Sequence, residues 1–238
     1  MNVLVTGGAS GLGEAITRAF CKTQKYFVHF TFNSSKEKAK TLEHEFTNCK
    51  SFFCDFKNPE MILELQGSME KMNLDILINN AYSGKFIENY FHKTPAQHFE
   101  NDFQINVLPT IKITQTAIEH FRKKKSGIIL TVLTSALDGI PPLGASSYLG
   151  VKAYLAEMVK VWAAENSKFN IISKAISPSL MLTAMTDTLD ERMIEQIREN
   201  TPNKKLLTTQ ETAEKILSLC HNPTTNGNGQ NLFLKPGY

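Results

Sequence analysis

The chain has 238 residues, of which 42% are hydrophobic and 21% are charged, a balance typical of a globular protein and not of a disordered one. Its net charge of +3 is too small to argue for a nucleic acid or an anionic membrane as a partner. No apolar run approaches the roughly 20 residues of a membrane span, and the opening strand pattern leaves no room for a signal peptide. The four scattered cysteines indicate reduced thiols in a cytoplasmic protein, and the spacing of the six histidines predicts no metal site.

A glycine-rich segment follows the first apolar run. Residues 2–5 have the pattern of a strand, and apolar residues recur at helical spacing after Gly13. Strand, glycine turn and helix form the context that a dinucleotide-binding loop requires, because glycine lets the backbone approach a pyrophosphate and the helix N-terminus offers free N–H groups. A bare glycine turn is common, but in this context we predict cofactor binding at Thr6, Gly7, Ser10, Gly11, Leu12 and Gly13.

Strand and helix patterns alternate along the chain. Nearly continuous apolar runs, typical of parallel strands covered on both faces, predict strands at residues 2–6, 26–32, 50–54, 74–79, 127–134, 169–177 and 230–235. Helical spacing predicts helices at residues 12–23, 35–47, 59–71, 96–124, 147–166 and 209–220. This alternation predicts an α/β fold, a Rossmann-type doubly wound parallel sheet in a three-layer α/β/α sandwich. We expect one dinucleotide-binding domain over residues 1–238, with a substrate lid at about 178–207.

The segment after the second predicted strand bears on the choice between NAD and NADP. Folds that prefer NAD place an Asp or Glu about 20 residues beyond the glycine loop, on the ribose 2′-hydroxyl. Here that place holds Asn33, Ser34, Ser35 and Lys36, none of which would repel a 2′-phosphate. We therefore expect NADPH or NADP, with NADH or NAD as the alternative. The competing interpretation is a plain helix cap, in which Ser34 and Glu37 form a capping box and bind no phosphate.

Tyr148 and Lys152 lie four residues apart in a predicted helix, so both side chains point to one face. A phenol normally keeps its proton until about pH 10, and a neighbouring ammonium lowers that pKa. The pair therefore predicts a general acid that works near neutral pH. By itself this spacing is more often a solvated surface pair, so the interpretation depends on the rest of the chain.

The chain resembles the short-chain dehydrogenase/reductase family over essentially its whole length. Tyr148 follows Ser135 by 13 residues, the spacing that the family usually shows. The matching residues occur in the family's order: Thr6, Gly7, Gly11 and Gly13 in the glycine pattern, then Asn79-Asn80-Ala81, Asn106, Ser135, Tyr148, Lys152, Pro178 and Thr183. The C-terminal segment 227–237 resembles the corresponding strand of β-ketoacyl-carrier-protein reductases.

The resemblance implies a catalytic role for four residues. Tyr148 would donate the proton, Lys152 would lower its pKa and bind the nicotinamide ribose, and Ser135 would orient the carbonyl oxygen. Asn106 would hold a helix distortion and a water that links Lys152 to solvent. Without Tyr148, Ser135 and Asn106 would be an ordinary strand-end serine and helix asparagine.

The resemblance also implies contacts along the cofactor. Asp55, followed by Phe56, would lie at the adenine, and Asn79, Asn80 and Ala81 would form the floor beneath the cofactor. Pro178 and Thr183 would lie at the nicotinamide. Relatives pair the helices that match residues 96–124 and 147–166, which implies a homodimer or homotetramer.

Three positions depart from the family pattern. Tyr82 stands where a glycine usually follows Asn-Asn-Ala, and its ring would either narrow the cleft or point to solvent. Ser179 replaces the glycine of Pro-Gly, which leaves the loop over the nicotinamide open to change. Ser10 stands where many NADPH-preferring relatives carry a basic residue, which counts against NADPH.

These features together predict an NADPH-dependent reductase of a ketone, such as a β-ketoacyl thioester or a biosynthetic intermediate. One alternative is oxidation of a secondary alcohol or a sugar. Another is a non-catalytic nucleotide-binding sensor or scaffold, although a sensor has no need of Tyr148 and Lys152 together.

Overall fold

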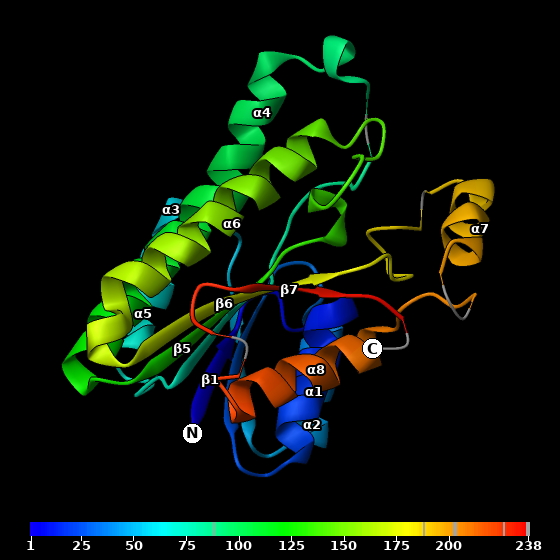
Figure 1. Ribbon diagram of the computed structural model, residues 1–238. Helices are drawn as coiled ribbons and strands as arrows, with labels where there is room; N and C mark the ends of the chain where they lie inside the picture. The colour runs from blue at the N-terminus through cyan, green and yellow to red at the C-terminus, as the bar shows by residue number, and fades with distance from the viewer. Residues whose placement is uncertain (88, 188, 202–203, 226, 237–238) are drawn as a thin grey trace.

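The apolar runs form the central sheet. The computed structural model describes residues 1–87, 89–187, 189–201, 204–225 and 227–236. Within that part of the chain, parallel strands form a seven-stranded sheet in the order β3-β2-β1-β4-β5-β6-β7 (Figure 1). The strands are β1 (Asn2–Val5), β2 (Phe27–Phe32), β3 (Cys49–Phe53), β4 (Ile76–Asn79), β5 (Gly127–Val132), β6 (Ile171–Pro178) and β7 (Asn231–Leu234). The predicted doubly wound parallel sheet is confirmed.

Helices cover both faces of this sheet (Figure 1). One core layer lies beneath α1 (Gly11–Lys22), α2 (Lys36–Glu45) and α8 (Thr209–His221). The other lies beneath α3 (Pro59–Met69), α5 (Leu108–Lys124) and α6 (Ser146–Asn166). Phe20 and Phe30 are fully buried in the first layer and Phe121 in the second, so each face of the sheet has its own apolar core.

The strand order reverses between β1 and β4. From β1 the chain proceeds outward through β2 and β3, and it then returns to place β4 on the other side of β1, with Val5 opposite Ile78. The segments that leave β1 and β4 at their carboxyl ends therefore diverge, and ligands of such sheets bind in the crevice at this point.

The predicted helix at residues 96–124 is interrupted. After α4 (Ala96–Asp102) the chain passes through a wider π turn at Phe103–Val107 before α5 begins at Leu108. Pro109 gives the physical reason, because it has no N–H to donate to the carbonyl of Ile105, four residues earlier. The predicted bounds of 96–124 agree with the structure, and the wider turn includes Asn106, where a distortion was expected.

The predicted lid at 178–207 contains a helix that the sequence pattern did not separate. Pro178 still belongs to β6, and α7 (Glu191–Glu199) stands away from the body of the molecule (Figure 1). The Asp190 carboxylate caps α7 by accepting the N–H of Arg192 at 2.7 Å. Short 3₁₀ turns complete the described chain at Phe91–Lys93, Ser135–Leu137 (η3) and Ser167–Phe169. None of the helices in the described ranges has the length and apolar character needed to span a bilayer.

Candidate active site

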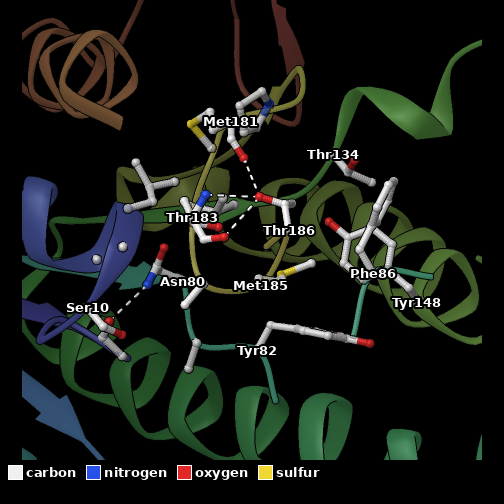
Figure 2. A pocket seen from close by; sticks show the side chains of 18 of the residues that line it. Ser10, Asn80, Tyr82, Phe86, Thr134, Tyr148, Met181, Thr183, Met185 and Thr186 are labelled. Atoms are coloured by element: carbon white, nitrogen blue, oxygen red, sulfur yellow. Dashed lines mark hydrogen bonds between the residues drawn. The ribbon is translucent and has the colours of Figure 1, made fainter. Parts of the chain in front are cut away.

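A cleft of about 970 Å³ opens at the carboxyl ends of the central strands, where the strand order reverses. Most of the predicted site residues line it: Gly7, Ser10, Gly11, Leu12, Gly13, Asn33, Ser34, Ser35, Asp55, Phe56, Asn80, Ala81, Ser135, Tyr148, Lys152, Pro178 and Thr183. Figure 2 shows part of this lining, with the glycine loop on one side and Tyr148 on the other. Four predicted residues, Thr6, Lys36, Asn79 and Asn106, lie outside the lining.

The turn after β1 has a shape that only glycines permit. Gly7 and Gly11 have φ of +67° and +52°, in the left-handed region. A Cβ at Gly13 would lie 1.9 Å from the carbonyl oxygen of Gly7, so a larger residue would push α1 away from the turn. Ser10 is the N-cap of α1 and makes no side-chain cap bond, which leaves first-turn N–H groups of α1 directed at the cleft. This arrangement fits the pyrophosphate of a dinucleotide.

Thr6 lies beneath the cleft and holds its floor by hydrogen bonds. Its Oγ1 accepts the backbone N–H groups of Asn80 at 2.9 Å and of Ala81 at 3.0 Å. The Asn80 amide donates back to the carbonyl oxygens of Thr6 at 2.9 Å and Gly7 at 3.3 Å. Asn79 is tied from the other side, because its amide donates to Oγ1 of Thr114 at 2.9 Å. The floor of the cleft is thereby locked to the glycine turn.

The predicted 2′-phosphate residues do not all face the cleft. Asn33, Ser34 and Ser35 line it, but Lys36, the first residue of α2, does not. Lys38 lines it instead, because residues two positions apart point to different sides of a helix. The Nζ of Lys38 also lies 3.9 Å from a carboxylate oxygen of Glu14. Of these two lysines, Lys38 and not Lys36 therefore lines this end of the cleft.

The alternative capping box at this position does not form. Ser35, not Ser34, is the N-cap of α2, and it makes no side-chain cap bond. By contrast, a capping box is present at the start of α8, with Thr208 and Glu211 bonded reciprocally. The serines before α2 are consequently not engaged as caps, which leaves their hydroxyls available to a ligand in the cleft.

Tyr148 and Lys152 lie in the first turns of α6 and are almost fully buried, with 7% and 5% of their surface exposed. The Nζ of Lys152 donates to the carbonyl oxygen of Val132, at the end of β5, at 2.8 Å and lies 5.8 Å from the centroid of the Tyr148 ring. Ser135 begins the 3₁₀ turn η3, which packs against α6. Thr134, directly before it, accepts the N–H of Ala136.

Burial controls the acidity of both groups. It raises the pKa of Tyr148 to about 12, and the Thr134 hydroxyl opposes this shift by hydrogen bonding to the phenol. Burial also lowers the pKa of Lys152 to about 8. For the protein alone, burial therefore gives a net rise in the pKa of Tyr148, whereas the sequence predicted a net lowering by Lys152. The rings of Tyr82 and Phe86 pack edge-on against the Tyr148 ring and contribute to its burial.

Asn106 reaches the site through a loop. Its Oδ1 accepts the N–H of Ser83 at 2.7 Å, and its Nδ2 donates to the carbonyl oxygen of Ser83 at 3.0 Å. Its backbone carbonyl accepts the Thr110 hydroxyl at 2.8 Å. Asn106 lies in the π turn, so the predicted helix distortion is present at this residue. Its carboxamide holds the segment that carries Ala81 and Tyr82.

Two of the three departures from the family pattern, Tyr82 and Ser179, have different outcomes. Tyr82 lines the cleft, and its ring meets the Tyr148 ring edge-on at 5.0 Å between centroids, so it narrows the cleft and does not point to solvent. Ser179 keeps an ordinary backbone: it is not among the residues with positive φ, and its N–H donates to the carbonyl of Leu234 at 2.9 Å. A glycine is not needed there.

The lid contributes an apolar wall. Met181 and Met185 line the cleft from the segment after β6, and Met193 and Ile197 line it from α7. Thr186 fixes the start of this segment, because its hydroxyl lies at hydrogen-bond distance from the Thr183 N–H and from the carbonyls of Met181 and Thr183 (Figure 2). Met181 also packs against the core layer beneath α1 and α8, so this residue serves both the core and the cleft wall.

Some lining residues were missed by sequence reasoning. Two of them could have been found from their neighbours, because Lys38 lies two positions from the predicted Lys36 and Thr134 directly precedes the predicted Ser135. Phe86, Ile140 and Pro142 lie in irregular segments, and no spacing rule connects them with the cleft.

Comparison with known proteins agrees with this geometry. The sequence model of a family described as enoyl-(acyl carrier protein) reductase matches residues 7–238. The 3-oxoacyl-[acyl-carrier-protein] reductase FabG of Rickettsia prowazekii is 28% identical over 236 residues, which cover 98% of this chain and 95% of that protein.

Two solved structures are similar over nearly the whole chain. The 3-ketoacyl-(acyl-carrier-protein) reductase of Brucella melitensis, complexed with NADH, has a TM-score of 0.87 at 23% identity, covering 99% of this chain and 97% of that one. ElxO with NADP bound has a TM-score of 0.85 at 25% identity, covering 100% of this chain and 98% of that one.

Proposed function

Because this chain belongs to the short-chain dehydrogenase/reductase family, we propose that it is an NADPH-dependent oxidoreductase that reduces a ketone, with Tyr148 as the proton donor. Members of this family are NAD(P)-dependent oxidoreductases that act on alcohols and carbonyls. The observation that carries the proposal is the placement of Tyr148 and Lys152 in the wall of the cleft that begins at the glycine turn. A bound nicotinamide would supply the hydride.

The chain's own residues provide the proton and its control. Tyr148 stays protonated at neutral pH, because burial holds its pKa near 12, and so it is ready to donate to a developing alkoxide. Ser135 would donate a hydrogen bond to the same oxygen and orient the carbonyl. Lys152, buried beside the phenol, would favour the phenolate left after proton transfer. Asn106 supports these groups from below through Ser83.

The preference for NADPH is supported by the adenosine end of the cleft. Asn33, Ser34, Ser35 and Lys38 line it and carry no negative charge, and a carboxylate there would repel a 2′-phosphate. Asp55 and Phe56 line the cleft near by and would contact the adenine. Thr183 and Pro178, at the other end, would contact the nicotinamide.

The substrate proposed is a ketone with an apolar extension, and β-ketoacyl thioesters are the first to test. The support is the apolar wall of Met181, Met185, Met193 and Ile197, which suits a flexible acyl chain better than a polyol. Oxidation of a secondary alcohol is the reverse reaction on the same groups. The same proposal includes one domain over residues 1–238 with a lid at about 178–207, a homodimer or homotetramer, and a cytoplasmic location.

The test is a fluorescence titration with NADPH, NADP, NADH and NAD, followed by a screen of ketones monitored by nicotinamide absorbance. We expect NADPH to bind most tightly and to be oxidised when a ketone is added. Tightest binding of NAD or NADH would overturn the cofactor proposal and favour alcohol oxidation. Failure of all four to bind would overturn the proposed enzyme and favour a non-catalytic role.

A matched pair of lysine variants tests the phosphate site. Lys38→Gln should weaken NADPH binding while leaving NADH binding unchanged, and Lys36→Gln should change neither, because only Lys38 lines the cleft. Asn33→Asp should shift the preference toward NADH by charge repulsion. Equal effects of the two lysine substitutions, or an unchanged preference in Asn33→Asp, would contradict the assignment.

A further inference from the structure

Two aromatic rings enclose the side chain of Tyr148 (Figure 2). The ring of Tyr82 meets it edge-on at 5.0 Å between centroids and 85° between planes. The ring of Phe86 meets it at 5.1 Å and 88°. Both residues line the cleft, so the Tyr148 ring lies against two other aromatic rings in the cleft wall. We refer to Tyr82 and Phe86 as the aromatic clamp.

The backbone holds the clamp in place from three sides. Before Tyr82, the Thr6 hydroxyl accepts the N–H groups of Asn80 and Ala81. After Tyr82, the Asn106 side chain hydrogen-bonds both the N–H and the carbonyl of Ser83. Gly84 has φ of +140°, and a Cβ there would lie 3.2 Å from both Cε1 and Oη of Tyr82. The loop therefore folds closely around the Tyr82 ring, and the missing side chain of Gly84 makes room for it.

The clamp also contacts the lysine. The Nζ of Lys152 lies 5.4 Å from the centroid of the Tyr82 ring, within the range of a cation–π interaction. Tyr82 thus touches both members of the Tyr148–Lys152 pair. Family members usually have a glycine where this chain has Tyr82. A relative with that glycine lacks both the ring contact with Tyr148 and the cation–π contact with Lys152.

We propose that Tyr82, supported by Phe86, positions Tyr148 and Lys152 and restricts the substrate to ketones that are slim beside the carbonyl. The clamp occupies space in the cleft next to Tyr148, where a substituent on the carbon next to the carbonyl would otherwise fit. A straight chain can extend toward the apolar wall of the lid, whereas a branch at that carbon meets a ring. This inference rests on the proposed reduction of a ketone.

The titratable and polar groups around Tyr148 determine how its pKa responds to a substitution. The titratable groups in contact with its ring are Tyr82, from the segment after β4, and Lys152, from α6 itself. Thr134, from the end of β5, adds a hydroxyl. On α4, which packs against α6, Asp102 accepts a hydrogen bond from Ser147 at 2.5 Å, and His98 lies 3.6 Å from the same carboxylate. Removing the Tyr82 ring changes the desolvation of Tyr148 and leaves these other groups in place.

The first experiment is a near-ultraviolet titration of phenolate absorbance, which requires no turnover. Each variant is compared with the same variant carrying Tyr148→Phe, so that the difference isolates Tyr148. Tyr82→Gly should lower the pKa of Tyr148 by about one unit or more, because water reaches the phenol. Tyr82→Phe, which keeps the ring, should titrate like the wild type. Tyr90→Ala is the matched control, because Tyr90 is an exposed aromatic of the same connection and lies outside the cleft.

The second experiment measures kcat/KM for a straight-chain ketone and for its isomer branched next to the carbonyl. Tyr82→Gly should raise the ratio of branched to straight by about tenfold or more, and Tyr82→Phe should leave it unchanged. An unchanged titration or an unchanged ratio in a folded Tyr82→Gly protein would overturn the inference. If the wild type turns over no ketone, the proposed function fails, while the titration still decides whether the clamp controls Tyr148.

Discussion

Replacing Thr6 with valine removes a hydroxyl and keeps the shape of the side chain. In the native protein that hydroxyl accepts two backbone N–H groups, from Asn80 at 2.9 Å and from Ala81 at 3.0 Å. A buried donor that loses its partner costs about 1–3 kcal/mol. Both donors are only half-buried, so the lower part of that range applies to each, and we expect a loss of about 2–3 kcal/mol in the free energy of unfolding.

The assay is urea unfolding of Thr6→Val at equilibrium, with NADPH titration of the folded protein. Nucleotide affinity should fall as well, because the floor of the cleft loses the two bonds to the Thr6 hydroxyl and is held to the glycine turn only by the Asn80 amide. Thr41→Val is the control: Thr41 is exposed on α2, and its hydroxyl bonds only within the helix, so its change should stay within about 0.5 kcal/mol. A loss in Thr6→Val no larger than in Thr41→Val would refute the reasoning.

Two further predictions concern stability. Gly13→Ala should destabilise the protein by about 1–3 kcal/mol, since the added Cβ would lie 1.9 Å from the Gly7 carbonyl oxygen. Gly67→Ala is the control: no atom lies within 4 Å of its added Cβ, so it should stabilise α3 slightly. Equal effects of the two substitutions in thermal unfolding would contradict this reasoning. Burial, with the charge of Lys50, lowers the pKa of His29 to about 4 from an ordinary value of 6.5. Between these values the unfolded state binds a proton that the folded state does not, so stability falls as the pH drops from about 6.5 to 4. His29→Leu should flatten that part of a stability–pH profile, and an unaltered slope would argue against the assignment.

The sequence alone predicted the sheet well, for a physical reason. The central strands are runs of apolar residues buried on both faces, such as Ile76, Leu77 and Ile78 in β4. Burial of that kind leaves a pattern that can be recognised without knowledge of the neighbouring strands. The distortion at Phe103–Val107 was expected only through the family resemblance of Asn106, although Pro109 also signalled it. Helix α7 was missed although Asp190 is a typical N-cap residue and Met193 and Ile197 have helical spacing.

The chemistry of the site was harder to predict, because it depends on tertiary neighbours. Tyr148 and Lys152 are an i, i+4 pair, which suggested that the ammonium sets the acidity of the phenol. The rings that surround Tyr148 come from Tyr82 and Phe86, more than 60 residues earlier in the chain, and no local pattern places them there. Similarly, only the rotation of α2 decides that Lys38, and not Lys36, faces the cleft.

The central claim, that Tyr148 donates the proton in a reaction that uses a bound nicotinamide, is tested most directly by Tyr148→Phe. We expect turnover to fall by about 10²–10⁴-fold while the affinity for NADPH stays close to that of the wild type, because the ring and its packing remain. Tyr154→Phe is the matched control on the same helix, since that ring lies half-exposed against Phe103 and should not affect turnover. Turnover by Tyr148→Phe equal to that of Tyr154→Phe would contradict the account.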